Sequence, residues 1–359
     1  MVAIMSVTPD IPRDPQQEVL VQAAPLRELL VKLYVQKGMF KAEAEIAAER
    51  QIEADLRGIH SHGSRATPRY LAAMDRGDID PRGATLVVRE TPAIAVMDGG
   101  RNLGHVASTK AMLKAIEMAR KVGTGTVAVG NSQHYGAASV YSLMAAREGM
   151  IGYCTTSTGM ATVAALGSRA PAVANNAFAW AAPVRTGAPF CLDMACAVSS
   201  WGKVQTLGMY GKSIPAGWAL DSSGAPTVDA KAAKTLLPAA GARGYGLAFL
   251  CSILAGPLVG GKMPLHKTRG PELEGSEHFF YAIDVKQFID IERFHDEMDQ
   301  TMNDIRALPP ADGFEQVTLP GELESERAER WAREGIPLHR DHLRELGEVA
   351  EKLKIPVPW

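Results

Sequence analysis

The spacing of apolar residues predicts helices in the first part of the chain. Between residues 24 and 59, apolar side chains such as Leu26, Leu29 and Leu33 recur every three or four positions, and a stretch rich in Ala and Glu follows them. Lys37-Gly38 separates the two stretches. This pattern predicts two amphipathic helices joined by a tight turn.

The middle of the chain alternates between strand-like and helical patterns. After Pro81 and Gly83, short runs rich in β-formers or small apolar residues predict strands, and longer periodic runs predict helices. Such alternation is typical of an α/β core. The predicted strands are 85–89, 93–97, 126–130, 151–155, 177–182 and 190–194, and the predicted helices are 107–122, 137–148 and 245–258.

Helical patterns return from Ile291 onwards, with charged amphipathic stretches at 322–334 and 340–354. Because helices occupy both ends of the chain, we predict one discontinuous helical domain built from residues 20–83 and 300–359. Residues 84–299 then form an α/β domain.

The charge balance argues against two classes of partner. The formal net charge is -2, and basic residues are mixed with acidic ones along the chain. Nucleic acid and anionic membrane surfaces are therefore not expected partners.

Cysteine usage and hydropathy favour a cytoplasmic, soluble protein. The cysteines form no CxxC pair, so we expect reduced, buried thiols. The first 25 residues lack the basic and apolar regions of a signal peptide. The most apolar stretch, 247–260, is interrupted by glycine and proline and is shorter than the roughly 20 residues that span a bilayer. The cysteines are Cys154, Cys191, Cys196 and Cys251.

Common cofactor motifs are absent from the sequence. A Rossmann fingerprint needs GxGxxG between a strand and a helix. Gly123-Thr-Gly125 precedes its strand, and Gly244-Tyr-Gly246 lacks the third glycine. The sequence also contains no Walker A loop, no GxSxG elbow and no HExxH helix.

Two histidine-bearing segments are candidates for chemistry. His60 and His62 lie in a turn bounded by Gly58 and Gly63, which suits exposed imidazoles as well as structural ones. His134 lies in the polar loop 131–136 after a predicted buried strand, where α/β proteins commonly place reactive groups. The alternative for that loop is an Asx-type turn with a solvated histidine.

Asp193 is the third candidate, because it is a carboxylate within an apolar run at the predicted end of a strand. A buried carboxylate needs partners. It could hold an imidazole in one tautomer, or it could cap the next helix, and the spacing alone does not choose between these roles.

A different class of function uses the same residues. His60 and His62, together with His134 and Asp193, could bind zinc in a metal-dependent hydrolase. Such enzymes place their HxH motif after a buried strand, whereas the preceding residues AERQIEADLRG are helical, so we predict no metal site. A non-catalytic binding protein has no need for paired imidazoles beside a buried carboxylate.

Several ordered segments carry a family resemblance that runs almost from end to end. Together they are similar to the type 2 malate/L-lactate dehydrogenase family. The segments are RGIHSHG (57–63) with Pro68 and Tyr70, NLGH (102–105), NSQHYGAAS (131–139), LDMACAVSSWGKV (192–204), RGYGLAFLCSILAGPLVGG (243–261) and LPGE (319–322).

The resemblance implies a fold and a cofactor. It implies a homodimer with a mixed-sheet, non-Rossmann cofactor domain, a helical domain from both termini, and NADH or NADPH as hydride donor. Arg243 stands where relatives usually have lysine, which keeps the charge but changes its shape. The implied cofactor contacts are Thr158, Asp193, Met194, Arg243, Gly244, Pro320, Gly321 and Glu322.

The resemblance also implies a reaction. Hydride would pass between the nicotinamide and a small 2-hydroxy acid, 2-oxo acid or related carbonyl compound, and NADPH-dependent reduction of a cyclic imine is the alternative within the family. His62 and His134 map onto the acid/base histidines, with Asp193 near the chemistry. An imidazole suits this role because its unperturbed pKa is about 6.5. The implied substrate contacts are Ser61, Arg65 and Tyr70.

The sequence departs from the family pattern at two places. Relatives usually read SHGxxRxPxY, whose arginine can bind a substrate carboxylate, but Ala66 holds that position here and Arg65 precedes it. Asn175-Asn176-Ala177 lacks a proline that relatives tend to have after the asparagine. We therefore expect an altered substrate pocket. Because His60 lies outside the matching SHG position, its loss should be mild.

Overall fold

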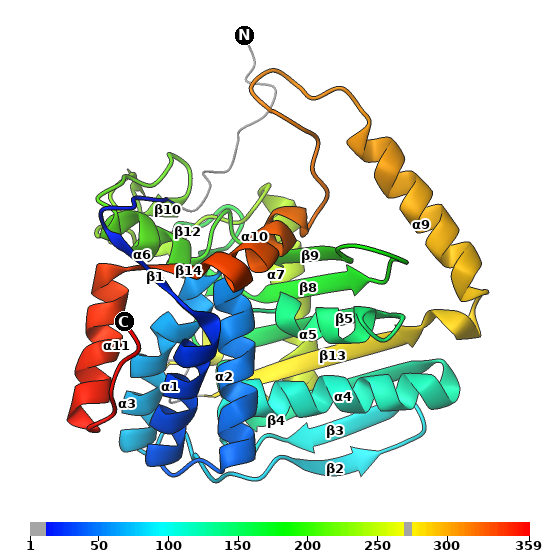
Figure 1. Ribbon diagram of the computed structural model, residues 1–359, viewed down its shortest axis with the longest axis horizontal. Coiled ribbons are helices and arrows are strands. Elements are labelled where there is room, and N and C mark those ends of the chain that lie inside the picture. The colour runs from blue at the N-terminus through cyan, green and yellow to red at the C-terminus, as the bar shows by residue number, and fades with distance from the viewer. Residues whose placement is uncertain (1–11, 269–274) are drawn as a thin grey trace.

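A seven-stranded mixed sheet forms the centre of the protein (Figure 1). The computed structural model describes residues 12–268 and 275–359. The strand order is β2-β3-β4-β13-β5-β8-β9, and only β3 and β4 pair in parallel. This mostly antiparallel sheet differs from the parallel sheet of a doubly wound fold. The strands are β2 (Leu86–Glu90), β3 (Ile94–Asp98), β4 (Thr124–Ser132), β5 (Met150–Thr158), β8 (Ala177–Ala182), β9 (Phe190–Ala195) and β13 (Ser276–Asp284).

Both faces of the sheet are covered, because alternate residues of a strand point to opposite faces. On β5, Cys154 packs with helices α4 and α5, whereas Tyr153 packs with α6, α7 and a small second sheet on the other face. The helices are α4 (Gly104–Val122), α5 (Ser139–Ala146), α6 (Trp201–Met209) and α7 (Ala242–Leu254). The second sheet, in the order β11-β10-β12-β6-β7, contains β6 (Val163–Ala164), β7 (Pro171–Val173), β10 (Ala219–Leu220), β11 (Pro226–Thr227) and β12 (Thr235–Leu236).

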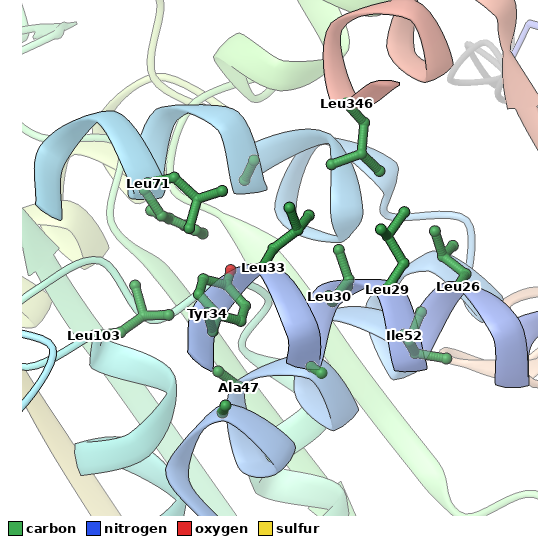
Figure 2. Close-up of a cluster of buried hydrophobic side chains, with 14 of the residues drawn as sticks. Leu26, Leu29, Leu30, Leu33, Tyr34, Ala47, Ile52, Leu71, Leu103 and Leu346 are labelled. Atoms are coloured by element: carbon green, nitrogen blue, oxygen red, sulfur yellow. The ribbon is translucent and has the colours of Figure 1, made fainter. Parts of the chain in front are cut away.

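Helices from both ends of the chain share one core. Leu26, Leu30 and Leu33 of α1 point into a cluster that Leu346 of α11 also enters (Figure 2). Strand β1 pairs antiparallel with β14 beside this cluster. The elements are β1 (Glu18–Val21), α1 (Ala23–Gln36), α2 (Lys41–Leu56), α3 (Thr67–Asp75), α10 (Glu322–Glu334), β14 (Ile336–His339) and α11 (Arg340–Lys352).

Helix α9 (Ile291–Arg306) projects from the sheet, away from α1, α2 and α11 (Figure 1). Asp290 caps its N-terminus by accepting hydrogen bonds from the N–H groups of Glu292 and Arg293. Met302 is the one residue of this helix that is buried. Nearly all of the surface of α9 is therefore not packed against the rest of the described chain.

The structure confirms the mixed α/β class and most of the predicted elements. The predicted helix 245–258 ends earlier, at Leu254, because Gly256 and Pro257 begin a separate turn, η3 (Pro257–Val259). Strand β13 was not predicted, although it is central to the sheet. The boundaries 20–83, 84–299 and 300–359 remain predictions. Further 3₁₀ turns are η4 (Pro264–His266) and η5 (Val285–Gln287).

The segment that contains α7 is the most apolar of the described residues. Ala242–Val259 is long and apolar enough, by length and composition, to cross a membrane. It is not one continuous helix, since α7 ends at Leu254, and its residues Ala248 and Cys251 are buried against the core. The helix is thus partly buried against the core of the protein. The cytoplasmic location stays a prediction.

Candidate active site

A short turn at the end of α2 carries the first histidine pair. It consists of η1 (His60–His62) and η2 (Ser64–Ala66). The fully buried carboxylate of Asp55 anchors it, because Oδ2 accepts the N–H of Ser64 (2.8 Å) and Oδ1 accepts Nδ1–H of His60 (3.1 Å). A buried carboxylate with hydrogen-bond partners fixes the backbone around it. Asp55 therefore positions the turn.

Neighbouring residues hold the same turn from other sides. A Cβ on Gly63 would lie 2.2 Å from Oδ1 of Asp55, so only glycine allows this close approach. The ring of His60 stacks on Trp331, with centroids 5.6 Å apart. Oγ of Ser64 lies 3.1 Å from Nε2 of His342 on α11. Contacts from α10 and α11 thus complete a turn that lies near the start of the chain.

His134 lies in the loop that follows β4, and this loop is tightly held. Gln133 donates from Nε2 to the carbonyl of Asp78, and its own carbonyl oxygen lies 3.0 Å from Nε2 of the buried His278. A Cβ on Gly104 would lie 2.0 Å from the same carbonyl oxygen of Gln133, so glycine lets α4 begin directly beneath the loop. The position of His134 is therefore fixed by the surrounding packing.

The structure brings His62 and His134 together. Their rings stack with centroids 5.4 Å apart and an interplanar angle of 27°, and both side chains are half-buried. Oη of Tyr70 lies 2.6 Å from Nδ1 of His134, and Oγ of Ser61 lies 2.9 Å from Nδ1 of His62. Four of the predicted site residues therefore form one cluster that joins α3, the η1 turn and the β4 loop.

The hydrogen bonds of His134 define its tautomer. The backbone N–H of Gly136 donates to Nδ1 (3.3 Å), the same nitrogen that Tyr70 contacts. Because a backbone N–H can only donate, Nδ1 is an acceptor, and the neutral ring carries its proton on Nε2. The ring thus offers an Nε2–H donor, with Nδ1 already occupied.

Burial keeps both imidazoles neutral at pH 7. Loss of hydration, followed by the positive charges of Arg69 and Arg65, lowers the pKa of His62 to about 4. Burial and the charge of Arg69 also lower the pKa of His134 well below its usual value. A neutral imidazole can accept a proton, so the pair is in the protonation state that a general base requires.

Arg65 contacts α6. Its guanidinium donates to Oγ1 of Thr206 (2.8 Å) and to Oε1 of Gln205 (3.1 Å). Arg69, one helical turn further on, has its guanidinium carbon 5.3 Å from the centre of the Tyr70 ring. Arg69 adjoins the site, because it lies over the ring of Tyr70, which bonds to His134, and its charge lowers the pKa of both imidazoles. Arg69 was not predicted as a site residue, because nothing in the sequence around it distinguishes it from other exposed arginines.

Asp193 is a half-buried residue of β9. Its Oδ2 accepts the backbone N–H of Ser139 (2.9 Å) at the beginning of α5, and burial raises the pKa of its carboxyl. No hydrogen bond joins it to either imidazole in the described residues. Asp193 therefore acts as a cap of α5. It does not cap the next helix along the chain, α6, because Ser200 does so.

The other predicted cofactor residues lie at ends of strands and helices. Thr158 ends β5, Met194 pairs with Phe178 between β9 and β8, and Arg243 and Gly244 lie in the first turn of α7. The carbonyl of Pro320 accepts the N–H of Cys191 on β9 (3.1 Å), which brings Pro320 and Gly321 close to Asp193. Glu322 begins α10, where Arg306 donates to its Oε1 (2.6 Å).

The metal-site alternative has no geometric support in the described part of the chain. There, no group of three or more His, Cys, Asp or Glu side chains is arranged to hold a metal ion. His60 bonds to Asp55, whereas His62 stacks on His134. The two histidines of the HxH motif therefore have different partners.

Comparison with known proteins identifies the family. Residues 21–347 match the malate/L-lactate dehydrogenase family. The chain belongs to the malate/L-lactate dehydrogenase family. It is therefore an oxidoreductase of an NAD(P)-dependent family that acts on the CH–OH group of hydroxy acids, and the hydrolase alternative is wrong.

Individual relatives cover nearly the whole chain. A malate dehydrogenase from Pyrococcus abyssi is 37% identical over 92% of this chain and 94% of its own length. A ureidoglycolate dehydrogenase (NAD(+)) from Escherichia coli O157:H7 is 33% identical over 88% of this chain and 91% of its own length. The structure of malate dehydrogenase from Pyrococcus horikoshii OT3 superposes with a TM-score of 0.88 at 31% identity, covering 96% and 99% of the two chains. The fold of this malate/L-lactate dehydrogenase family member thus extends over both ends of the chain.

Proposed function

We propose that this enzyme transfers a hydride between a nicotinamide cofactor and a small 2-hydroxy acid, which it oxidises to the 2-oxo acid. The observation that carries the proposal is the stacked pair of neutral imidazoles, His62 and His134, with Tyr70 bonded to one of them. Loss of hydride from a CH–OH group requires that the hydroxyl proton leave, and a neutral imidazole can accept it. In this proposal Nε2–H of His134 binds the substrate oxygen, and His62 accepts the proton.

Arg69 is the proposed partner of the substrate carboxylate. Ala66 provides no cation at the position where relatives usually have arginine, and Arg65 already donates to Thr206 and Gln205. Arg69 is exposed and close enough for its charge to act on both imidazoles. A guanidinium there could bind a carboxylate beside the reacting carbon.

The residues that the family resemblance assigns to the cofactor fit a nicotinamide dinucleotide. The buried hydroxyl of Ser157, next to Thr158, has no hydrogen-bond partner among the described residues, so it is available to a ligand. Arg243 is exposed in the N-terminal turn of α7, where a guanidinium suits a pyrophosphate. When bound, the nicotinamide supplies or receives the hydride. The chain's own residues position the substrate and move the proton.

The experiment that tests this function is a substrate screen. Malate, lactate, sulfolactate and ureidoglycolate are supplied with NAD+ and NADP+, the corresponding oxo acids and cyclic imines are supplied with NADH and NADPH, and nicotinamide absorbance is followed. We expect turnover with at least one hydroxy acid. Turnover with cyclic imines alone would show that the proposed substrate class is wrong.

We expect NADH or NADPH to stabilise the folded protein without added metal. A ligand that binds only the folded state at about 100 times its Kd adds about 2.7 kcal/mol to the free energy of unfolding. The melting temperature should therefore rise by several degrees at saturating cofactor, and a chelator should not change that shift. An unchanged melting temperature with both cofactors would contradict nicotinamide binding.

We propose that the enzyme is a homodimer, and we expect light scattering at micromolar concentration to give twice the chain mass. Apolar side chains on α7, including Phe249 and Leu250, are exposed although the rest of the helix is packed in the core. A large exposed apolar face marks an interaction surface. Leu250→Glu should therefore shift the mass towards the monomer.

Leu113→Glu is the matched control for this experiment, because Leu113 is equally exposed but lies on α4. It should leave the mass unchanged. A fully active monomer of the unsubstituted protein at micromolar concentration would overturn the dimer.

A further inference from the structure

A cavity of about 420 Å³ lies between the end of α5, the turn that joins β8 to β9, and the first half of α10. We call it the Arg57 cavity. Its polar side chains are Arg57, Arg147, Ser325 and Glu329, of which the last two lie one helical turn apart on the same face of α10. None of these residues belongs to the imidazole cluster or to the cofactor contacts described above.

Arg57 is the unusual member of this cavity. Arg57 directly follows Leu56, the last residue of α2, and is only 6% exposed. Within residues 12–268 and 275–359, no hydrogen bond or ion pair involves its guanidinium, and its Nε is buried without a partner. Buried charges in proteins are normally paired, because removing an ion from water is costly. The end of α2 compensates for only a small part of that cost.

The other charges around the cavity do not supply the missing partner. Arg147 is itself a cation, and it forms an ion pair with Glu53, which Arg50 also contacts. Glu329 is exposed at the surface of α10 and makes no ion pair in the described structure. The charge of Arg57 reaches the Cys191 and Asp193 side chains, where it lowers the pKa of both groups against the effect of burial. Pro189, which lines the cavity, directly precedes β9, the strand that carries Asp193.

We propose that the Arg57 cavity binds the phosphate group of a small molecule, with Arg57 as the buried cationic partner and Arg147 as a second cation. A guanidinium binds phosphate oxygens through two parallel hydrogen bonds, and Ser325 adds a hydroxyl donor. Two sources share this chemistry: the 2′-phosphate of NADPH and a separate phosphate-bearing molecule. The first source rests on the proposed function, because it requires that the dinucleotide extend from the imidazole pair past Asp193.

The test measures the Kd values of NADPH and NADH by fluorescence titration, and the thermal shift caused by inorganic phosphate, for the full-length protein and its Arg57→Met variant. Methionine removes the charge without breaking an ion pair, so the variant should fold. Arg147→Met is the second variant, and Arg120→Met, an exposed arginine on α4 that pairs with Glu148, is the matched control.

A 2′-phosphate in the cavity predicts that Arg57→Met raises the Kd of NADPH at least tenfold while NADH is nearly unaffected. A separate phosphate ligand predicts that inorganic phosphate stabilises the unsubstituted protein, and that Arg57→Met abolishes this shift with both cofactors unaffected. Arg147→Met should show a smaller effect of the same kind, and Arg120→Met none. If folded Arg57→Met binds both cofactors normally and phosphate stabilises neither protein, the proposal is wrong. Failure of both cofactors to bind the unsubstituted protein would instead overturn the proposed function, and the phosphate titration would still decide this proposal.

Discussion

Replacing either His62 or His134 with alanine is expected to lower kcat by about a hundredfold to ten-thousandfold, the range typical of losing a general acid or base. The two rings stack on one another, and each is neutral at pH 7 because burial lowers its pKa. Steady-state turnover of the best hydroxy acid measures the effect. The Kd of the nicotinamide cofactor should change little, since neither ring is among the proposed cofactor contacts.

His60→Ala is the control for that experiment. His60 is two residues from His62 but bonds to Asp55 and stacks on Trp331, so it supports the turn without facing His134. We expect less than a tenfold loss of kcat, together with lower stability of the folded protein. If His60→Ala abolished turnover while His62→Ala and His134→Ala kept near-normal kcat, the acid/base assignment would be wrong.

The free energy of unfolding is expected to fall steeply as the pH drops below about 6.5. Burial lowers the pKa of five imidazoles, to about 4 for His62, to about 3 for His105, His278 and His342, and well below the usual value for His134. In the unfolded chain these groups bind protons near their ordinary pKa of about 6.5. Below that pH the unfolded state binds more protons than the folded state, so stability is lost as the pH falls.

The size of this effect is large enough to unfold the protein. Each imidazole removes about 1.4 kcal/mol per pH unit between its two pKa values, so His62, His105, His278 and His342 together remove on the order of 8 kcal/mol by pH 5, and His134 acts in the same direction. This is comparable with the entire stability of many proteins, about 5–15 kcal/mol. We expect an acid transition between about pH 5 and 6, measured by tryptophan fluorescence and circular dichroism at fixed protein concentration.

His105→Leu tests the cause of the transition. His105 is buried and neither ring nitrogen has a hydrogen-bond partner among the described residues, so leucine removes a titrating group without removing a bond. The midpoint should move to lower pH. His266→Leu, at an exposed histidine, should leave it unchanged. A protein whose stability is constant from pH 7 to pH 5 would contradict the prediction.

Periodicity predicted most of the longer helices and six of the seven strands of the central sheet, because their buried faces are built from apolar residues, whereas α3, α6 and the short strands outside that sheet were not predicted. Leu26, Leu29 and Leu33 are all fully or nearly fully buried, as their spacing requires. Strand β13 was not predicted because its sequence, SEHFFYAID, begins with polar residues that are nevertheless buried. Glu277 pairs with the buried Lys267, and His278 bonds to Ser132, so partners distant in the sequence make that burial possible.

The candidate site could be predicted only in part. The sequence placed His62 and His134 in turns, but it could not show that their rings stack, since they lie in separate elements. Arg69 and Asp55 carry no local signal, because their importance comes from what the folded chain puts beside them. For Asp193 the spacing left two roles open, and its observed partner, Ser139, lies 54 residues earlier.

The contact between Ser64 and His342 has a consequence for how the enzyme is made. The two residues are 278 positions apart, and β1 pairs with β14 across a similar separation. During translation the α/β sheet can therefore assemble before the turn that carries His62 receives its support from α11. We therefore expect chains truncated before α11 to lack the support of this turn and to be inactive. Without α11, the apolar residues that it covers in the cluster of Figure 2 are expected to stay exposed, which favours aggregation of the incomplete chain.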